Sequence, residues 1–149
     1  MRTVIQRVSR ASVQVDGCEI GAIGQGLVVF LGIHRDDGPE TIDWMADKII
    51  NLRIFADELG KMNRSLADIQ AEMLIVSQFT LYGDCRKGRR PGYSDAAPPE
   101  IAEQMYNDFI SAIKRRGIPS AAGKFQAMMQ VSLINDGPVT LLIDSAKTC

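Results

Sequence analysis

Strand-like segments lie near both ends of this chain, and only two stretches between them have the apolar spacing of a helix. Alternating or continuous apolar residues predict strands over residues 3–8, 11–15, 27–31, 54–55, 73–81, 125–134 and 139–143. Helices are predicted from Pro39 and from Pro99, where proline suits the first turn. Because the strands do not alternate with helices, we expect an α+β domain with a barrel-like sheet and two main helices.

Length and composition limit the chain further. The 149 residues suffice for one domain over 1–149, and the net charge of −1 leaves polyanion binding to a local basic patch. The longest apolar run, 27–33, is too short to cross a bilayer, and the first residues contain no apolar signal core. We therefore expect a cytoplasmic protein with no membrane partner.

Histidine and cysteine are scarce. His34 is the single histidine, and Cys18, Cys85 and Cys149 show no C-x-x-C spacing. This set offers neither a zinc site nor a disulfide framework, so we expect no metal and no cofactor. Any chemistry must depend on groups other than imidazole, and His34 is interpreted as a surface residue after a strand.

The segment Ser77-Gln78-Phe79-Thr80-Leu81 places polar residues inside an apolar strand. Buried polar groups cost free energy unless they are hydrogen-bonded. Two interpretations stay open at this point. Ser77 and Gln78 face water, or the strand ends at a substrate pocket.

Asn135-Asp136-Gly137-Pro138 has the composition of a hairpin turn between the last two strands. A second role would depend on the Gly137–Pro138 bond, and only about 5% of X-Pro bonds are cis in folded proteins. A third segment, residues 86–93, holds Arg86, Lys87, Arg89 and Arg90 beside Tyr93. Cations beside an aromatic ring suit phosphates and a stacked base, although a solvated loop has the same composition.

Together these segments resemble the D-aminoacyl-tRNA deacylase family over nearly the whole chain. The resemblance is carried by strings in a fixed order: I-Q-R-V at 5–8, R-A-S-V at 10–13, G-K-M-N at 60–63, V-S-Q-F-T-L at 76–81, R-P at 90–91, A-A at 96–97 and M-Q-V-S-L-I-N-D-G-P-V-T at 129–140. The last residues, 144–149, and Cys18 and Cys85 lie outside these strings.

The resemblance implies a homodimer with active sites at the subunit interface. The family's S-Q-F-T segment maps onto Ser77, Gln78, Phe79 and Thr80, which would line the site for the aminoacylated 3′ end of tRNA. Asn135, Gly137, Pro138, Met129 and Arg7 would bind substrate or hold the motif, and Arg86, Lys87, Arg89 and Arg90 would bind tRNA.

A cis Gly137–Pro138 bond, inserted into the partner's pocket, would leave no room for an L side chain. The implied substrates are D-aminoacyl-tRNA and glycyl-tRNA mischarged on tRNA(Ala), because glycine has no side chain to exclude.

The implied reaction is hydrolysis of the aminoacyl ester in translation quality control. Water would attack with help from the vicinal ribose hydroxyl, and a backbone N–H near Phe79 would stabilise the oxyanion. A nucleophilic Thr80 ranks lower, because no base lies near it in sequence. Two alternatives are a non-hydrolytic nucleic-acid-binding module of the same fold and an editing domain for another aminoacyl-tRNA.

Overall fold

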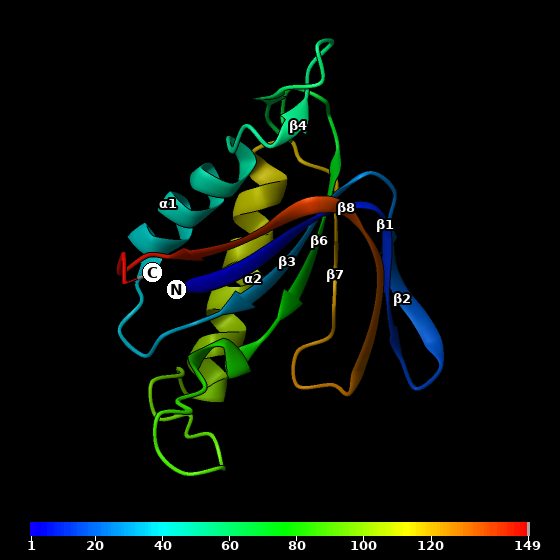
Figure 1. Ribbon diagram of the computed structural model, residues 1–149. Helices are drawn as coiled ribbons and strands as arrows, with labels where there is room; N and C mark the ends of the chain where they lie inside the picture. The colour runs from blue at the N-terminus through cyan, green and yellow to red at the C-terminus, as the bar shows by residue number, and fades with distance from the viewer. Residues whose placement is uncertain (149) are drawn as a thin grey trace.

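Two helices cover one face of a curled sheet in the computed structural model, which describes residues 1–148 (Figure 1). From the N-terminus the elements are β1 (Arg2–Val15), β2 (Cys18–Ile23), β3 (Gly26–Gly32), α1 (Pro39–Ile50), β4 (Phe55–Ala56), β5 (Met62–Arg64), β6 (Glu72–Ser77), the 3-10 helix η1 (Phe79–Tyr82), α2 (Pro99–Arg115), β7 (Ser120–Ala122) and β8 (Met129–Asp144). The expected barrel-like sheet with two main helices is confirmed.

Strand β1 organises the sheet. One edge of β1 pairs antiparallel with β3 and then with β2, while the other edge pairs with β8 along nearly its whole length. The sheet almost closes because β2 approaches β7 at Gly21, where an added Cβ would lie 3.2 Å from the Ala122 carbonyl oxygen. The pairings β3–β6 and β6–β7 are parallel, with α1 and α2 in the crossovers. These two crossovers were not expected from the sequence.

Several predicted strand boundaries are wrong. The two predicted strands at 3–8 and 11–15 form the single strand β1, whose buried positions change phase around exposed Ser9 and Arg10. A bulge causes this phase change, and it made one strand look like two. The last two predicted strands likewise form the single strand β8, which begins at Met129. Strand β7 was not predicted, because its three residues are too few to leave a pattern.

Two turns outside the long strands have clear causes. Asp16 and Gly17 both have positive φ, at 51° and 77°, as a two-residue hairpin between β1 and β2 requires. In the turn that leads into β5, the Asp57 carboxylate accepts hydrogen bonds from the side chain of Asn63 and the backbone of Lys61. These bonds lower the pKa of Asp57.

The core has two layers. Leu27, Val29 and Leu31 of β3 face the helices, while Val28 faces the inside of the curled sheet with Val8 and other apolar residues. Strand β3 is therefore buried on both faces, as its continuous apolar run predicted. Its neighbour β6 is buried in the same way over 73–76, and it carries the chain directly to Ser77.

Candidate active site

Strand β6 ends at Ser77, and the chain turns into η1 instead of continuing as a strand to Leu81. The predicted strand over 73–81 is thus wrong in its second half. The turn packs on the end of β3, where the Gln78 backbone N–H donates to the Leu31 carbonyl oxygen at 2.8 Å. A Cβ at Gly32 would lie 3.0 Å from the Gln78 carbonyl oxygen, so glycine lets the turn approach β3 closely.

Phe79 and Thr80 both lie on the surface of this turn. The Phe79 ring is 56% exposed and meets the ring of Tyr93 edge-on, with 5.1 Å between the centroids. The Gln78 side-chain amide donates to the Thr80 hydroxyl oxygen. Among the described residues no carboxylate or imidazole contacts this hydroxyl, so Thr80 lacks the base that a hydroxyl nucleophile needs.

Arg2 braces the turn from strand β1. Its guanidinium donates to the Leu81 carbonyl oxygen at 2.9 Å, lies 4.7 Å from the Tyr82 ring centroid and pairs with Asp144 at 3.0 Å. Burial raises the pKa of Tyr82, and the nearby carboxylates of Asp37 and Asp144 raise it further. Tyr82 therefore stays protonated near neutral pH.

The segment 135–138 is not a hairpin turn. Strand β8 continues in the same direction past it, with Asn135 opposite Val8 and Thr140 opposite Gln6. Residues 136–139 thus lie opposite the single residue Arg7, and the extra length pushes residues 136–138 out as an exposed loop, while Val139 returns to the core. The Gly137–Pro138 bond is cis, as the family resemblance implied.

Arg7 holds this loop from strand β1. Its guanidinium donates to the carbonyl oxygens of Asp136 at 3.1 Å, Gly137 at 3.3 Å and Ile54 at 2.5 Å, and it pairs with the Asp136 carboxylate at 3.0 Å. The Asn135 side-chain amide closes the base of the loop by donating to the carbonyl oxygens of Arg7 and Val139. Arg7 thus contacts the loop, as the family resemblance implied, and its role toward substrate stays a prediction.

Within one chain, Ser77 and the Gly137–Pro138 loop lie at different places along the sheet. Ser77 pairs with Leu31 of β3, whereas Arg7, opposite the loop, pairs with Leu27. Four residues of strand separate these points by about 13 Å. Strands β1 and β3 also stand between β8 and β6. The two motifs therefore do not form one site within a chain.

The segment with the four cations, residues 84–92, is called the basic loop, and a pair of backbone hydrogen bonds closes it. The Asp84 N–H donates to the Gly92 carbonyl oxygen at 2.8 Å, and the Gly92 N–H donates back at 3.0 Å. The Asp84 carboxylate also accepts from the Arg86 side chain, at 2.8 Å to both Nε and Nη2, and this contact lowers the pKa of Asp84. The charge of Arg86 is thus largely compensated, unlike the charges of the exposed Lys87, Arg89 and Arg90.

Met129 lies beside Gly123, whose N–H donates to the Ile75 carbonyl oxygen. Met129 is therefore near the end of β6 that leads to Ser77. Its sulfur would be 2.6 Å from a Cβ at Gly123, and its side chain packs on the apolar cluster inside the sheet. The buried Tyr106 hydroxyl contacts the carbonyl oxygens of Ile75 at 2.8 Å and Gly123 at 3.2 Å. Burial raises the pKa of Tyr106 to about 12, so this hydroxyl stays a donor that fixes β6 just before Ser77.

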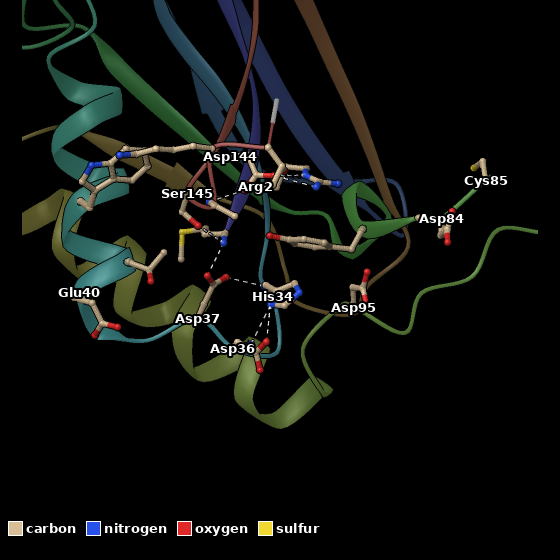
Figure 2. Close-up of a pocket in the computed structure, with 18 of the residues that line it drawn as sticks. Arg2, His34, Asp36, Asp37, Glu40, Asp84, Cys85, Asp95, Asp144 and Ser145 are labelled. Atoms are coloured by element: carbon tan, nitrogen blue, oxygen red, sulfur yellow. Dashed lines mark hydrogen bonds and ion pairs between the residues drawn. The ribbon is translucent and has the colours of Figure 1, made fainter.

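A cavity of about 1260 Å³ lies on the other side of η1, between the chain termini and the start of α1 (Figure 2). Sequence reasoning did not identify it. Its carboxylates, which outnumber its cationic groups, belong to Asp36, Asp37, Glu40, Asp84, Asp95 and Asp144. Many of these groups are paired, as Figure 2 shows for Arg2 and Asp144. An acidic cavity does not suit a phosphate backbone, and Ser77 to Thr80 do not line it.

His34 and the cysteines stand apart from Thr80. His34 lines the acidic cavity, packs on the Tyr82 ring at 5.2 Å and is only partly exposed. Cys18 and Cys85 are free and exposed, and Cys149 lies outside the described residues. Residues 1–148 gather no group of three His, Cys, Asp or Glu side chains that could hold a metal ion. In the same part of the chain, neither helix is long and apolar enough to cross a membrane.

Comparison with known proteins gives a consistent result. A family model described as D-Tyr-tRNA(Tyr) deacylase matches residues 4–144. A relative from Thermosipho africanus, named D-aminoacyl-tRNA deacylase, is 61% identical over 147 residues and aligns over 99% of both chains. A relative from Clostridioides difficile with the same name is 57% identical over 148 residues, again over 99% of both chains.

Two solved structures share the fold. A protein named c-Myc DNA Unwinding Element Binding Protein has a TM-score of 0.92 at 46% identity, covering 97% of this chain and 99% of its own. A probable eukaryotic D-amino acid tRNA deacylase has a TM-score of 0.82 at 18% identity, covering 95% and 97%. The fold and these relatives define the class as ester hydrolases that act on aminoacyl-tRNA. The chain belongs to the D-aminoacyl-tRNA deacylase family.

Proposed function

We propose that this chain frees D-amino acids from D-aminoacyl-tRNA at a site completed by a second copy of itself. In this homodimer, Ser77 to Thr80 of one subunit face the Gly137–Pro138 loop of the other. The observation that carries the proposal is the loop itself, which Arg7 holds out from β8 and which lies well away from the Ser77 segment of its own chain. Two-fold symmetry would bring each loop to the other subunit's turn.

The loop would select the hand of the amino acid with backbone atoms. Carbonyl oxygens near the α-carbon would accept hydrogen bonds from the α-ammonium and occupy the space of an L side chain. The Gly137 carbonyl already contacts Arg7 at 3.3 Å, but a carbonyl oxygen has a second lone pair for a ligand. Glycine has no side chain to exclude, so glycyl-tRNA is a proposed second substrate.

The ester would be cleaved without imidazole. The first N–H groups of a helical turn have no partner within that turn, which suits the Phe79 N–H to the developing oxyanion. Water would attack the ester carbon with the vicinal ribose hydroxyl assisting, and the bond to the ribose oxygen would break. Because the Thr80 hydroxyl is paired with Gln78, we expect Thr80→Ala to keep kcat within about threefold. A folded, substrate-binding variant without turnover would return the nucleophile role to Thr80.

Strand β8 supplies an apolar surface for the second subunit. Ile134, Leu141 and Leu142 are 47%, 37% and 49% exposed on this strand, which carries the Gly137–Pro138 loop between them. Leu141 and Leu142 point to opposite faces of the strand, and exposed apolar side chains on both sides of the loop are typical of an interaction surface. Sedimentation should show twice the 16.4 kDa chain mass at micromolar concentration. A monomer alone would contradict the shared site.

The decisive experiment is hydrolysis of matched D-tyrosyl-tRNA, L-tyrosyl-tRNA and glycyl-tRNA by the purified protein. The expected result is release of D-tyrosine and glycine with negligible release of L-tyrosine. Equal release of both tyrosine enantiomers would refute the loop as the selector. Binding without hydrolysis would favour a nucleic-acid-binding module, the role that the name of one structural relative indicates for that relative. Because charged tRNA is the substrate, we place this activity in the cytoplasm.

A further inference from the structure

Two aromatic rings form a surface beside the proposed site that the hydrolysis scheme does not use in full. Phe79 and Tyr93 are 56% and 40% exposed, and their rings meet at 5.1 Å with 65° between the planes. This geometry is a favourable edge contact. Since both rings keep a large part of their area open to solvent, the pair forms one continuous aromatic patch.

The backbone around Tyr93 holds this ring in place without a ligand. Gly92, directly before it, closes the basic loop by its two hydrogen bonds with Asp84. After it, the Ala96 N–H donates to the Tyr93 carbonyl oxygen at 3.2 Å, and the Ala97 N–H donates to the Ile33 carbonyl oxygen at 2.9 Å. The segment is thus pinned to the end of β3, the strand on which η1 also rests.

The glycine at position 83 makes room for the ring. A Cβ at Gly83 would lie 3.2 Å from Cε1 of Tyr93, so the end of η1 and the Tyr93 ring are in close contact. The cations of the basic loop, Lys87, Arg89 and Arg90, are exposed on the chain that leads into this ring. Exposed aromatic rings beside exposed cations are the combination by which proteins hold unpaired nucleic acid, with bases on the rings and phosphates on the cations.

We propose that Tyr93 stacks against an unpaired base, the one that precedes the terminal adenosine of tRNA, while the adjoining loop binds the phosphate backbone. This inference rests on the proposed function and extends it by one nucleotide, because Phe79 lies in the catalytic turn and Tyr93 lies next to it on the side of the basic loop. Tyr93 then contributes to the binding of tRNA and leaves the chemical step unchanged.

The test compares two substrates that differ in the proposed contact. D-tyrosyl-tRNA has the preceding nucleotide, and D-tyrosyl-adenosine lacks it. Tyr93→Ala should raise KM for D-tyrosyl-tRNA by roughly five- to a hundredfold, the range expected from loss of one stacked base. It should leave kcat for tRNA and both constants for D-tyrosyl-adenosine within about twofold. Tyr93→Phe should behave like the wild type, because the ring is kept.

Trp44→Ala is the matched control, since Trp44 is 39% exposed on α1 and lines the acidic cavity. It should leave KM for tRNA unchanged. An equal rise of KM with both substrates in Tyr93→Ala would overturn the proposal, because Tyr93 would then act only by supporting Phe79. An unchanged KM for tRNA would overturn it as well.

A binding measurement separates this inference from the proposed function. Fluorescence anisotropy with a short RNA of the unpaired tRNA 3′ sequence needs no hydrolysis. Weaker binding by Tyr93→Ala than by the wild type supports the stacking surface even in a protein that cleaves no ester. Equal binding by the two proteins overturns the surface, whatever the hydrolysis assays show.

Discussion

Two arginines of strand β1 hold two parts of the proposed site, and they differ in how much else supports each part. Arg2 contacts η1 through the Leu81 carbonyl oxygen and the Tyr82 ring, but the turn also rests on Gly32 and is hydrogen-bonded to Leu31. Arg7 is the side chain that donates to both Asp136 and Gly137 in the exposed loop. Beside it, Asn135 closes only the base of that loop.

Because the two parts differ in their support, substitutions in them should affect stability and activity to different extents. The Ser77 segment continues strand β6, which is buried over 73–76. A substitution that displaces this segment therefore disturbs the core as well as the site. The Gly137–Pro138 loop projects from an outer strand, so it can lose its orientation while the domain stays folded. Substitutions that release the loop should therefore lower activity far more than stability, whereas substitutions that displace the Ser77 segment should lower both.

Arg7→Ala should have the largest effect on activity. Without the guanidinium the loop carbonyls lose their fixed position, and misplacing a reacting group by roughly 1 Å costs about a hundredfold in rate. We expect kcat/KM for D-tyrosyl-tRNA to fall at least that far, with weaker exclusion of L-tyrosyl-tRNA. Thermal unfolding should change less than activity, because the hydrogen bonds that Arg7 makes to the loop lie at the surface and only its bond to the Ile54 carbonyl oxygen is part-buried. Loss of that bond should lower Tm by a few degrees.

Arg10→Ala is the control for this change, since Arg10 is an exposed arginine on the same strand. Its activity and D/L ratio should match the wild type. If the Arg7→Ala protein kept full activity, the Gly137–Pro138 loop would not need Arg7 for its orientation. The proposed difference between Arg2 and Arg7 would then be wrong.

Gly32→Ala should have the second-largest effect and should reduce stability as well as activity. The new Cβ would lie 3.0 Å from the Gln78 carbonyl oxygen and 3.1 Å from Leu81 Cβ, so η1 must shift by a few tenths of an ångström. Overpacking of this kind costs about 1–3 kcal/mol. We expect a clear fall in Tm and roughly a tenfold loss of kcat/KM.

Gly92→Ala serves as the comparison, because a Cβ there meets nothing within 4 Å. It should leave Tm unchanged. A Gly32→Ala protein with unaltered Tm and rate would mean that the turn tolerates displacement and that its packing on β3 does not position the site.

Local residue patterns predicted the regular elements around the site but not the turn at Phe79. The buried strand leading to Ser77 and the apolar stripes of both helices were predicted, because burial on a regular element leaves a periodic trace in the sequence. The turn at Phe79 left no such trace, since apolar Phe79 and Leu81 look like more strand. What stops the strand is the close packing of η1 on Gly32, a residue forty-five positions before Ser77 along the chain.

The path of the Gly137–Pro138 loop likewise depends on a contact that is distant in the sequence. Its composition predicted a hairpin, but Arg7, more than a hundred residues earlier, lets β8 continue while the loop projects. That contact was anticipated from family resemblance and not from any local pattern. The proposed pairing of the site across subunits would likewise depend on a second chain, so local patterns in one sequence offer no physical basis for it.

Replacing Arg86, Lys87, Arg89 and Arg90 together with Ala should have an effect on activity no larger than that of Gly32→Ala and should act on binding. We expect KM for D-tyrosyl-tRNA to rise about tenfold and its salt slope to flatten by about 0.7 for each phosphate that the loop no longer neutralises. The D/L ratio should stay the same. Arg86→Ala alone should contribute least, because Asp84 already compensates that charge.

Lys48→Ala, which removes an exposed lysine on α1, is the control and should leave the salt slope unchanged. A change in the D/L ratio after the loop substitutions would contradict the division between a loop that binds RNA and a loop that selects the hand.

Asp144→Asn should have the smallest effect on activity and should be seen as a pH-dependent change in stability. Burial by itself raises the pKa of Asp144, but hydrogen bonds from Thr148, Ala146 and Arg2 outweigh it, so the pKa lies below its ordinary 3.8. A carboxyl group with a lowered folded-state pKa adds stability above its unfolded-state pKa, and this contribution is lost as the pH falls through the folded-state value.

At pH 7 the wild type should therefore unfold at a higher temperature than Asp144→Asn. Hydrogen bonds to a charged group are worth about 1.5–3 kcal/mol, which corresponds to a Tm difference of roughly 3–10 °C. The difference should shrink as the pH falls below about 4. Because η1 keeps its contacts with Gly32 and Leu31, kcat/KM at pH 7 should stay within about twofold. A loss of activity as large as that of Arg7→Ala would mean that the turn depends on one arginine, as the loop does.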